Sequence, residues 1–188
     1  MVISGTGRAG TTFLVELLTN LGLDTGFTSH EASKLPKASF GGLESDIRKP
    51  SAPYIVKSPW FCDYMDEVIA SGDIELEHLI IPIRALRDAA ESRRRVSAMG
   101  CAAGGLWHTK SDSEGEQERV LAQKLYELVL SAASIHVPVT LLQFPLLALD
   151  QKYLFAKISF LLKPAGITYD EFSASFALTS KSERIHFL

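Results

Sequence analysis

Residues 1–22, MVISGTGRAGTTFLVELLTNLG, decide the fold class of this 188-residue chain. The short apolar run Val2-Ile3 is typical of a buried strand. Leucines recur at helical spacing over residues 14–21, and Gly22 is placed to end that helix. Between strand and helix, Gly5 and Gly10 have the spacing of a phosphate-binding loop. The stretch therefore predicts a strand, a glycine-rich loop and a helix, in that order.

The rest of the chain alternates short apolar runs with helical patterns. Further strands are expected at 54–56, 79–81 (with Pro82 near the exit) and 139–144. Further helices are expected at about 61–72, 86–98, 116–136 and 150–162, whereas 23–52 and 99–115 lack a clear period. Such alternation is typical of a parallel sheet covered on both faces. We expect an α/β fold over 1–188 as a single domain: a three-layer sandwich with a central parallel β-sheet, of the P-loop nucleotide-binding type.

Composition narrows the classes of partner. The net charge is −3, which disfavours a broad nucleic-acid surface, and the Arg93–Arg95 cluster is interpreted as a solvated helix face. Cys62 and Cys101 have no metal-type spacing and are expected to be reduced thiols. No apolar run approaches the roughly 18 residues of a membrane span, and the N-terminus has no signal-like pattern. We expect a soluble cytoplasmic protein without nucleic-acid or membrane partners.

The glycine-rich loop has chemistry suited to an anion. Successive backbone N–H groups and the positive end of the helix dipole both favour a bound phosphate. Gly5, Gly10, Thr11 and Thr12 stand where such a loop needs small or hydroxyl side chains. Thr11 occupies the position where a nucleotide triphosphatase has its lysine, and Arg8 supplies the positive charge instead. A tight turn without a ligand is the structural alternative.

A second basic residue follows the third predicted strand. Metal-dependent nucleotide hydrolases commonly end a buried strand in an aspartate that helps to hold magnesium, but here the strand HLIIPI ends in Arg84. This substitution predicts an anionic group that is transferred without a metal and that is accompanied by an additional phosphate.

At two separate sites the sequence resembles the sulfotransferases that use 3′-phosphoadenosine 5′-phosphosulfate (PAPS). RAGTT at 8–12 is similar to the family's 5′-phosphosulfate loop, and RALRDAAES at 84–92 is similar to its 3′-phosphate motif. Weaker likeness continues at Lys57-Ser58-Pro59 and over 141–167. The specific motifs cover about 20 residues, and the looser likeness covers most of the chain.

The resemblance implies a set of site residues. PAPS would be the co-substrate, without a metal, and Arg8 and Lys57 would be catalytic. Arg84 and Ser92 would hold the 3′-phosphate. The loop that binds the 5′-phosphosulfate would comprise eight consecutive residues: Gly5, Thr6, Gly7, Arg8, Ala9, Gly10, Thr11 and Thr12.

The general base is left open among four residues. The resemblance to sulfotransferases with a glutamate base favours Glu44, followed by His30, Glu31 and His108, although each could instead be an ordinary surface residue. The sequence also departs from the family. VKSPWF lacks the histidine that cytosolic members carry after the second strand, no glycine-rich segment is visible in 179–188, and the chain is short.

These features predict transfer of a sulfonate from PAPS to a hydroxyl of a small molecule or carbohydrate, an alcohol or a sugar. The polar stretches 23–52 and 99–115 are expected to shape the acceptor pocket, and Trp107 is expected to serve in packing. Two alternatives remain open: a small P-loop kinase that uses ATP and magnesium, and a non-catalytic nucleotide-binding module. Oligomeric state cannot be read from the sequence.

Overall fold

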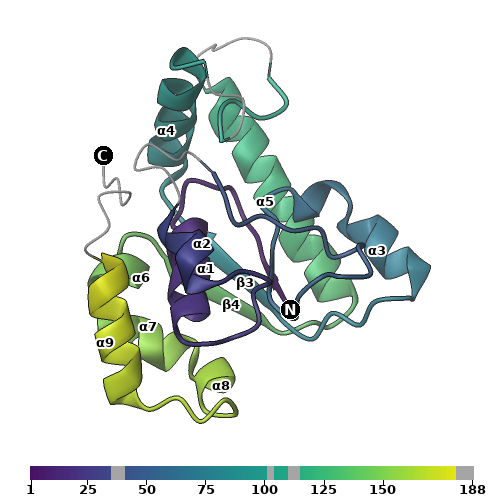
Figure 1. Cartoon of the computed structure of the whole chain (residues 1–188). Coiled ribbons are helices and arrows are strands. Elements are labelled where there is room, and N and C mark those ends of the chain that lie inside the picture. Colours follow the sequence, from purple (N-terminus) through teal and green to yellow (C-terminus); the bar gives the residue numbers. More distant parts are fainter. Residues whose placement is uncertain (35–40, 101–103, 110–114, 181–188) are drawn as a thin grey trace.

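Four parallel strands form the centre of the computed structural model, which describes the chain except for residues 35–40, 101–103, 110–114 and 181–188 (Figure 1). The strands are β1 (Val2–Ile3), β2 (Val56–Lys57), β3 (Leu79–Ile83) and β4 (Val139–Gln143), in the order β2-β1-β3-β4. Val2 of β1 lies opposite Val56 on one side and Leu79 on the other. The predicted α/β class with a parallel sheet is confirmed.

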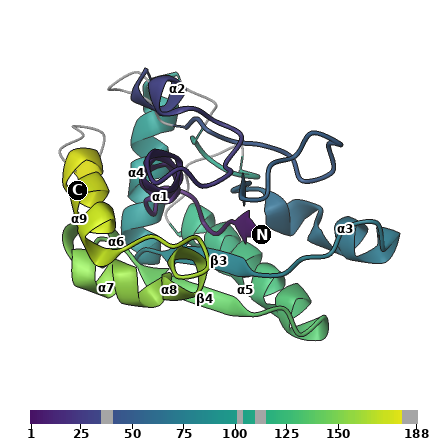
Figure 2. The same cartoon turned by 60° about the horizontal axis from the view of Figure 1, so that its bottom comes forward.

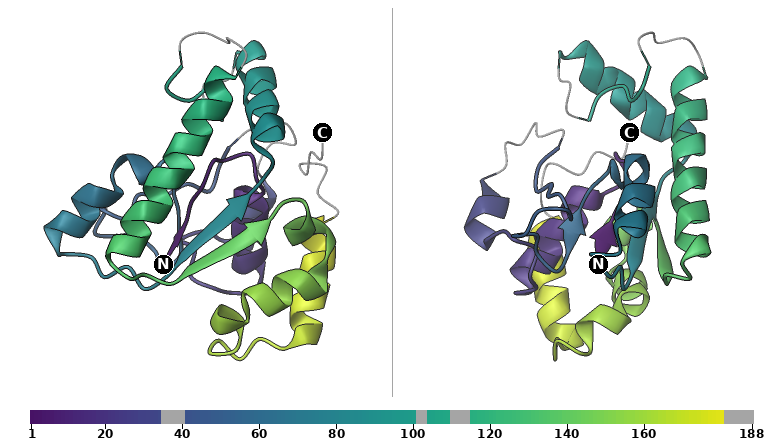
Figure 3. Two further views of the ribbon diagram at one scale, coloured as in Figure 1. Left: turned by 180° about the vertical axis from the view of Figure 1, so that it is seen from behind. Right: turned by 90° about the vertical axis from the view of Figure 1, so that its right-hand side faces the viewer.

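Helices cover both faces of the sheet. They are α1 (Thr11–Asn20), α2 (Ser29–Ser33), the 3₁₀ turn η1 (Phe61–Asp63), α3 (Met65–Ser71), α4 (Leu86–Ala98), α5 (Glu116–Ser134), α6 (Leu146–Leu149), α7 (Gln151–Lys157), α8 (Ser159–Leu162) and α9 (Tyr169–Ser180). Figure 2 shows α6, α7 and α8 following β4, with α9 beside them. The right-hand view of Figure 3 shows α5 (green) on one side of the strands and α1 (purple) with α9 (yellow) on the other.

Alternation along the strands explains the two layers of helices. Ile3 and Ile80 pack with buried residues of α1, α7 and α9, whereas Val2, Leu79 and Ile81 pack with buried residues of α3 and α5. Successive side chains of a strand point to opposite faces, so a strand without a polar residue needs cover on both sides. Both residues of β1 are buried accordingly.

The strand order fixes where a ligand can bind. The chain passes from β1 to β2 on one side, then crosses back to β3 on the other side of β1. The carboxyl ends of β1 and β3 therefore flank a topological switch point, the usual ligand-binding crevice of open parallel sheets. The loop of residues 4–10 leaves β1 at this point, and Arg84 follows β3 there.

The third strand is longer than predicted. It continues to Ile83 and contains Pro82, which stays in register with Leu142 of β4. The backbone groups of Ile80 face β1, because Ser4 donates to its carbonyl, so those of Pro82, two residues on, face the same side. Strand β1 has already ended there, and the missing N–H of proline therefore breaks no ladder bond.

Helix content also exceeds the prediction. The helix expected at 150–162 is divided at Ile158 into α7 and α8, and three helices, α2, α6 and α9, were not expected at all. Strand β2 begins two residues later than predicted. Cys101 and most of the C-terminal segment 179–188 lie outside the described residues. No helix in the described part of the chain combines the length and apolar character needed to cross a membrane.

Candidate functional site

The loop of residues 4–10, which we call the glycine-rich loop, has an unusual backbone. Gly5, Gly7 and Gly10 have φ values of 135°, 65° and 87°, and Arg8 has a φ of 55°. A residue with a side chain rarely adopts this left-handed region, and such outliers concentrate at ligand sites. Gly10 is the N-cap of α1 and offers no side-chain acceptor, so backbone N–H groups of the first helical turn remain available to an anion.

Two of the glycines are also required by close packing. A Cβ added to Gly5 would lie 3.0 Å from the carbonyl oxygen of Pro82 in β3. A Cβ added to Gly10 would lie 3.0 Å from Leu147 Cδ1 in α6 and 3.2 Å from Phe144 Cδ2. The loop is therefore seated between the ends of β3 and β4. Ala9 is fully buried in the core, so only its backbone can face a ligand.

The two motifs that resemble phosphate sites lie side by side. Arg8 Nε donates to Ser92 Oγ at 3.0 Å, and Arg84 Nη1 donates to the carbonyl oxygen of Arg8 at 3.2 Å. Burial lowers the pKa of both guanidinium groups, and the charge of Arg84 lowers the pKa of Arg8 further. Arg84 thus adds to the cost of keeping Arg8 charged in this buried setting, and an anion beside Arg8 would offset that cost.

Arg84 also presents an unused donor. Its side chain is buried, and among the described residues its Nη2 has no hydrogen-bond partner. The guanidinium carbon lies 4.9 Å from the ring centroid of Phe144. The two residues line a pocket of about 380 Å³ at the carboxyl ends of β3 and β4. The other lining residues are Ile83, Ala85, Asp88, Gln143 and Pro145. A buried donor without a partner is costly, so this atom is suited to a ligand oxygen.

Lys57, at the end of β2, is the most enclosed charged residue of the site, with 2% of its surface exposed. Its Nζ donates to Thr12 Oγ1 at 2.7 Å, to the Gly42 carbonyl at 2.5 Å and to Glu44 Oε1 at 2.9 Å. Burial lowers the pKa of Lys57, the Glu44 charge opposes that effect, and the charge of Arg8 adds to it. The structure thus brings Lys57 and Glu44 together beside the first turn of α1.

Glu44 is held in its ionised form. Burial opposes its charge, but the neighbouring Lys57 ammonium and the hydrogen bond from the Gly42 N–H at 2.9 Å outweigh burial and lower the pKa of the carboxyl. A carboxylate with a lowered pKa is a weak proton acceptor. Because the Glu44 charge raises the pKa of Lys57, loss of that charge would lower the pKa of Lys57.

Arg93 corrects the interpretation of the basic cluster as a solvated helix face. Its side chain is buried, and both Nε and Nη2 donate to the Thr6 carbonyl, at 3.2 and 2.7 Å. Arg95 is exposed, as predicted, and pairs with Glu91 at 3.2 Å, whereas Arg94 is only partly exposed and pairs with Glu118 at 2.6 Å. The reason is helical geometry, because Arg93 lies on the same face as the buried Ala89 and Val96.

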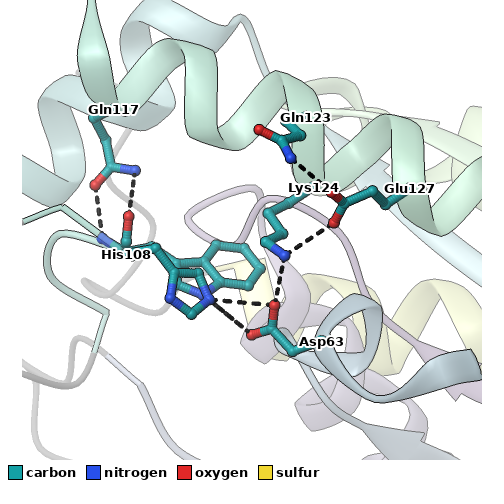
Figure 4. A network of polar contacts seen from close by, with 7 residues as sticks. Asp63, His108, Gln117, Gln123, Lys124 and Glu127 are labelled. Atoms are coloured by element: carbon teal, nitrogen blue, oxygen red, sulfur yellow. Dashed lines mark hydrogen bonds and ion pairs between the residues drawn. The ribbon is translucent and has the colours of Figure 1, made fainter. Parts of the chain in front are cut away.

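Figure 4 shows His108 in a polar cluster with Asp63 and Lys124, whereas Glu44 is bonded to Lys57 and Gly42. The His108 Nε2 is 3.2 Å from both oxygens of Asp63 in η1, and Lys124 Nζ of α5 is 3.0 Å from Asp63 Oδ1. Lys124 also pairs with Glu127, at 2.9 Å. The indole of Trp107 is buried as predicted for a packing residue, and Gln117 bonds the backbone of Trp107 from α5. The imidazole of His108 is thus oriented by a carboxylate while half of it stays exposed.

His30 and Glu31 occupy the exposed helix α2. The carboxylate of Glu31 already accepts from the N–H and hydroxyl of Thr28, both at 2.8 Å, and these bonds lower its pKa. The hydroxyl of Thr28 accepts in turn from the Glu31 N–H. Glu31 therefore has a structural role as part of the helix cap.

The sequence did not identify three groups that contact the candidate site residues: Arg93, Asp63 and the Gly42 carbonyl. Periodicity along α4 could have identified Arg93 as buried. No pattern links Asp63 to His108, or Gly42 to Lys57, because those contacts join segments 45 and 15 residues apart through the tertiary fold.

Comparisons with known proteins provide no relative from which the roles of these residues could be taken. No family model, no curated protein and no solved structure matches the chain. Among the described residues, no group of three or more His, Cys, Asp or Glu side chains is arranged to hold a metal ion.

Proposed function

We propose that the chain is a sulfotransferase of the P-loop-containing nucleotide-binding type, which moves a sulfonate from PAPS to a hydroxyl of a small alcohol or sugar. One observation carries the proposal: the buried Arg84, beside a pocket, has a guanidinium nitrogen without a partner among the described residues, and it is bonded to the glycine-rich loop through the Arg8 carbonyl. Two adjacent anion sites of this kind suit a nucleotide that carries phosphates at both ends of its ribose.

The residues present fit such a donor. The N–H groups at the start of α1, with Thr11 and Thr12, would hold the 5′-phosphosulfate, and Arg84 with Ser92 would hold the 3′-phosphate. When bound, the donor supplies a sulfonate on a phosphate that is a good leaving group. Arg8 would place positive charge beside that phosphate, and Lys57, already fixed by three hydrogen bonds, would place another.

Two residues suit the role of general base for different reasons. Glu44 lies next to Lys57, but its lowered pKa makes it a weak proton acceptor. His108 is oriented by Asp63, as bases in hydrolytic triads are oriented by a carboxylate, and its ring is half exposed. His30 and Glu31 have no comparable support, because α2 presents them to solvent and Glu31 caps the helix.

A thermal-shift comparison tests the proposal against the kinase alternative. The protein is heated with adenosine 3′,5′-bisphosphate without metal, and separately with ATP and magnesium. We expect the bisphosphate to raise the melting temperature, since a ligand at a hundredfold excess over its Kd adds about 2.7 kcal/mol to the free energy of unfolding. Stabilisation by ATP with magnesium and none by the bisphosphate would favour a kinase. Stabilisation by the bisphosphate without sulfonate transfer to any alcohol or sugar would favour a binding module.

A further inference from the structure

Arg93 is a buried cation that the proposed function does not use. Its side chain reaches from α4 to the inner side of the glycine-rich loop, where only 4% of the residue is exposed. Two of its nitrogens donate to the Thr6 carbonyl, and Nη1 donates to the Gly105 carbonyl at 2.6 Å. In the described part of the chain, the polar partners of Arg93 are thus backbone carbonyls, and no carboxylate forms a salt bridge with it.

These contacts fix the orientation of a peptide plane in the loop. The peptide group between Thr6 and Gly7 is planar and trans, so its C=O and N–H point in opposite directions. Because Arg93 holds the Thr6 carbonyl, the Gly7 N–H must point away from Arg93. The fit is close on the loop side as well, since a Cβ on Gly7 would lie 2.6 Å from Arg93 Nη2. The loop therefore rests directly on the guanidinium group.

The charge of Arg93 acts on the same loop. Burial lowers the pKa of Arg93 to about 10, and the nearby charge of Arg8 contributes to this shift. The group is still charged at neutral pH. A buried charge whose hydrogen-bond partners among the described residues are backbone carbonyls adds a positive potential to the loop, and it does so without having to touch a ligand.

Arg93 also joins the loop to the segment that carries His108. The Gly105 carbonyl accepts from Nη1, and the Trp107 ring centroid lies 5.1 Å from the guanidinium carbon. Ser97, one turn further along α4, accepts from the Leu106 N–H at 2.7 Å. One side chain thus fixes two backbone segments that are about 100 residues apart in the sequence.

We propose that Arg93 is a positioning residue: by clamping the Thr6 and Gly105 carbonyls it sets the anion-binding conformation of the glycine-rich loop and couples that loop to the Trp107–His108 segment. The bound anion, a phosphate of the PAPS nucleotide, is taken from the proposed function, and this part of the inference rests on that function. The clamp itself is a property of the protein without ligand and can be measured separately.

Amide hydrogen exchange tests the clamp without any ligand. The variants are Arg93→Met, which keeps the length of the side chain but removes the charge and every donor, and Arg93→Lys, whose single ammonium cannot reproduce the two-sided contact. Arg94→Met is the matched control, because it removes one arginine from the same helix but a different face. We expect faster exchange at 5–10 and 104–109 in both Arg93 variants, and wild-type exchange in the control. Urea unfolding identifies any variant that fails to fold. If Arg93→Met does not fold, exchange in Arg93→Lys tests the clamp.

Binding of adenosine 3′,5′-bisphosphate, measured by calorimetry, tests the consequence. We expect Arg93→Met to weaken binding at least about tenfold and Arg93→Lys to weaken it less, because the charge is retained. Wild-type exchange in the folded Arg93 variants, or wild-type affinity despite faster exchange, would overturn the inference. If the wild-type protein does not bind the bisphosphate, the sulfotransferase proposal fails, whereas the exchange measurement still decides whether Arg93 positions the loop.

Discussion

Adjacent residues of one type have different roles in α4. Arg94 and Arg95 pair with glutamates, whereas Arg93 is buried under the glycine-rich loop. The charge run suggested a solvated face, but the helical period places Arg93 in line with the buried Ala89 and Val96. The position of Arg93 in the helical period, and not its residue type, therefore determined that its side chain is buried. Lys57 was named as a site residue through the resemblance, and the sequence did not predict its three hydrogen-bond partners.

The Glu44–Lys57 pair gives the protein a specific dependence on pH. The pKa of Glu44 is lowered from its ordinary value of 4.5, so on acidification the unfolded chain binds the proton first. The stabilising contribution of the carboxylate is complete above about pH 4.5 and is lost as the pH falls through the lower folded pKa. We expect Glu44→Gln to reduce the free energy of unfolding at pH 7 by about 1–3 kcal/mol, because Lys57 loses its charged partner.

Urea unfolding at a series of pH values measures this difference. The gap between wild type and Glu44→Gln should narrow as the pH is lowered below 4.5. Glu75→Gln makes the same chemical change at an exposed position and controls for net charge. A gap that stays constant down to pH 3 would mean that Glu44 does not titrate with the lowered pKa derived from its contacts.

At the scale of elements, capping residues in the sequence could have predicted two helices, α2 and α9, that hydrophobic periodicity did not. Thr28 precedes α2 in the stretch Thr28-Ser-His-Glu31, and Thr168 precedes α9 in Thr168-Tyr-Asp-Glu171. In both, the glutamate accepts from the threonine N–H at 2.8 Å. This capping box was legible in the sequence. The division of residues 150–162 into α7 and α8 was not, because Tyr153, Leu154, Ile158 and Leu161 keep a continuous apolar pattern across the break.

The start of α1 is predicted to be intolerant of a side chain. Gly10→Ala places a Cβ at φ 87° and 3.0 Å from Leu147, which is fully buried and cannot move aside freely. Gly22→Ala, at the other end of the helix, has φ 78° and nothing within 4 Å. Both changes incur the left-handed cost of roughly 1–2 kcal/mol, and Gly10→Ala should lose about 1–3 kcal/mol more through overpacking. Equal losses in urea unfolding would show that α6 does not confine the loop.

For the whole molecule, the alternating pattern was enough to predict a parallel sheet, and the strand order then explains the site. Order β2-β1-β3-β4 places Lys57, the glycine-rich loop, Arg84 and Phe144 along one edge of the sheet. The sequence named Lys57, the glycine-rich loop and Arg84 as site residues through the resemblance, but it predicted neither the strand order nor the place of Phe144. It could not predict that Ser92 would bond Arg8, nor that His108 and Glu44 would lie in separate clusters, because side-chain packing between distant segments decides both.

We propose above all that this edge of the sheet holds a nucleotide with phosphates at both ends of its ribose. Calorimetric titration without magnesium, comparing adenosine 3′,5′-bisphosphate with adenosine 5′-monophosphate, tests it most directly. We predict at least tenfold tighter binding of the bisphosphate, equivalent to about 1.4 kcal/mol. Arg84→Met should remove this preference and leave monophosphate binding nearly unchanged, whereas Arg87→Met, at an exposed position in the first turn of α4, should preserve it. Equal affinities of the wild-type protein for the two nucleotides would contradict the account.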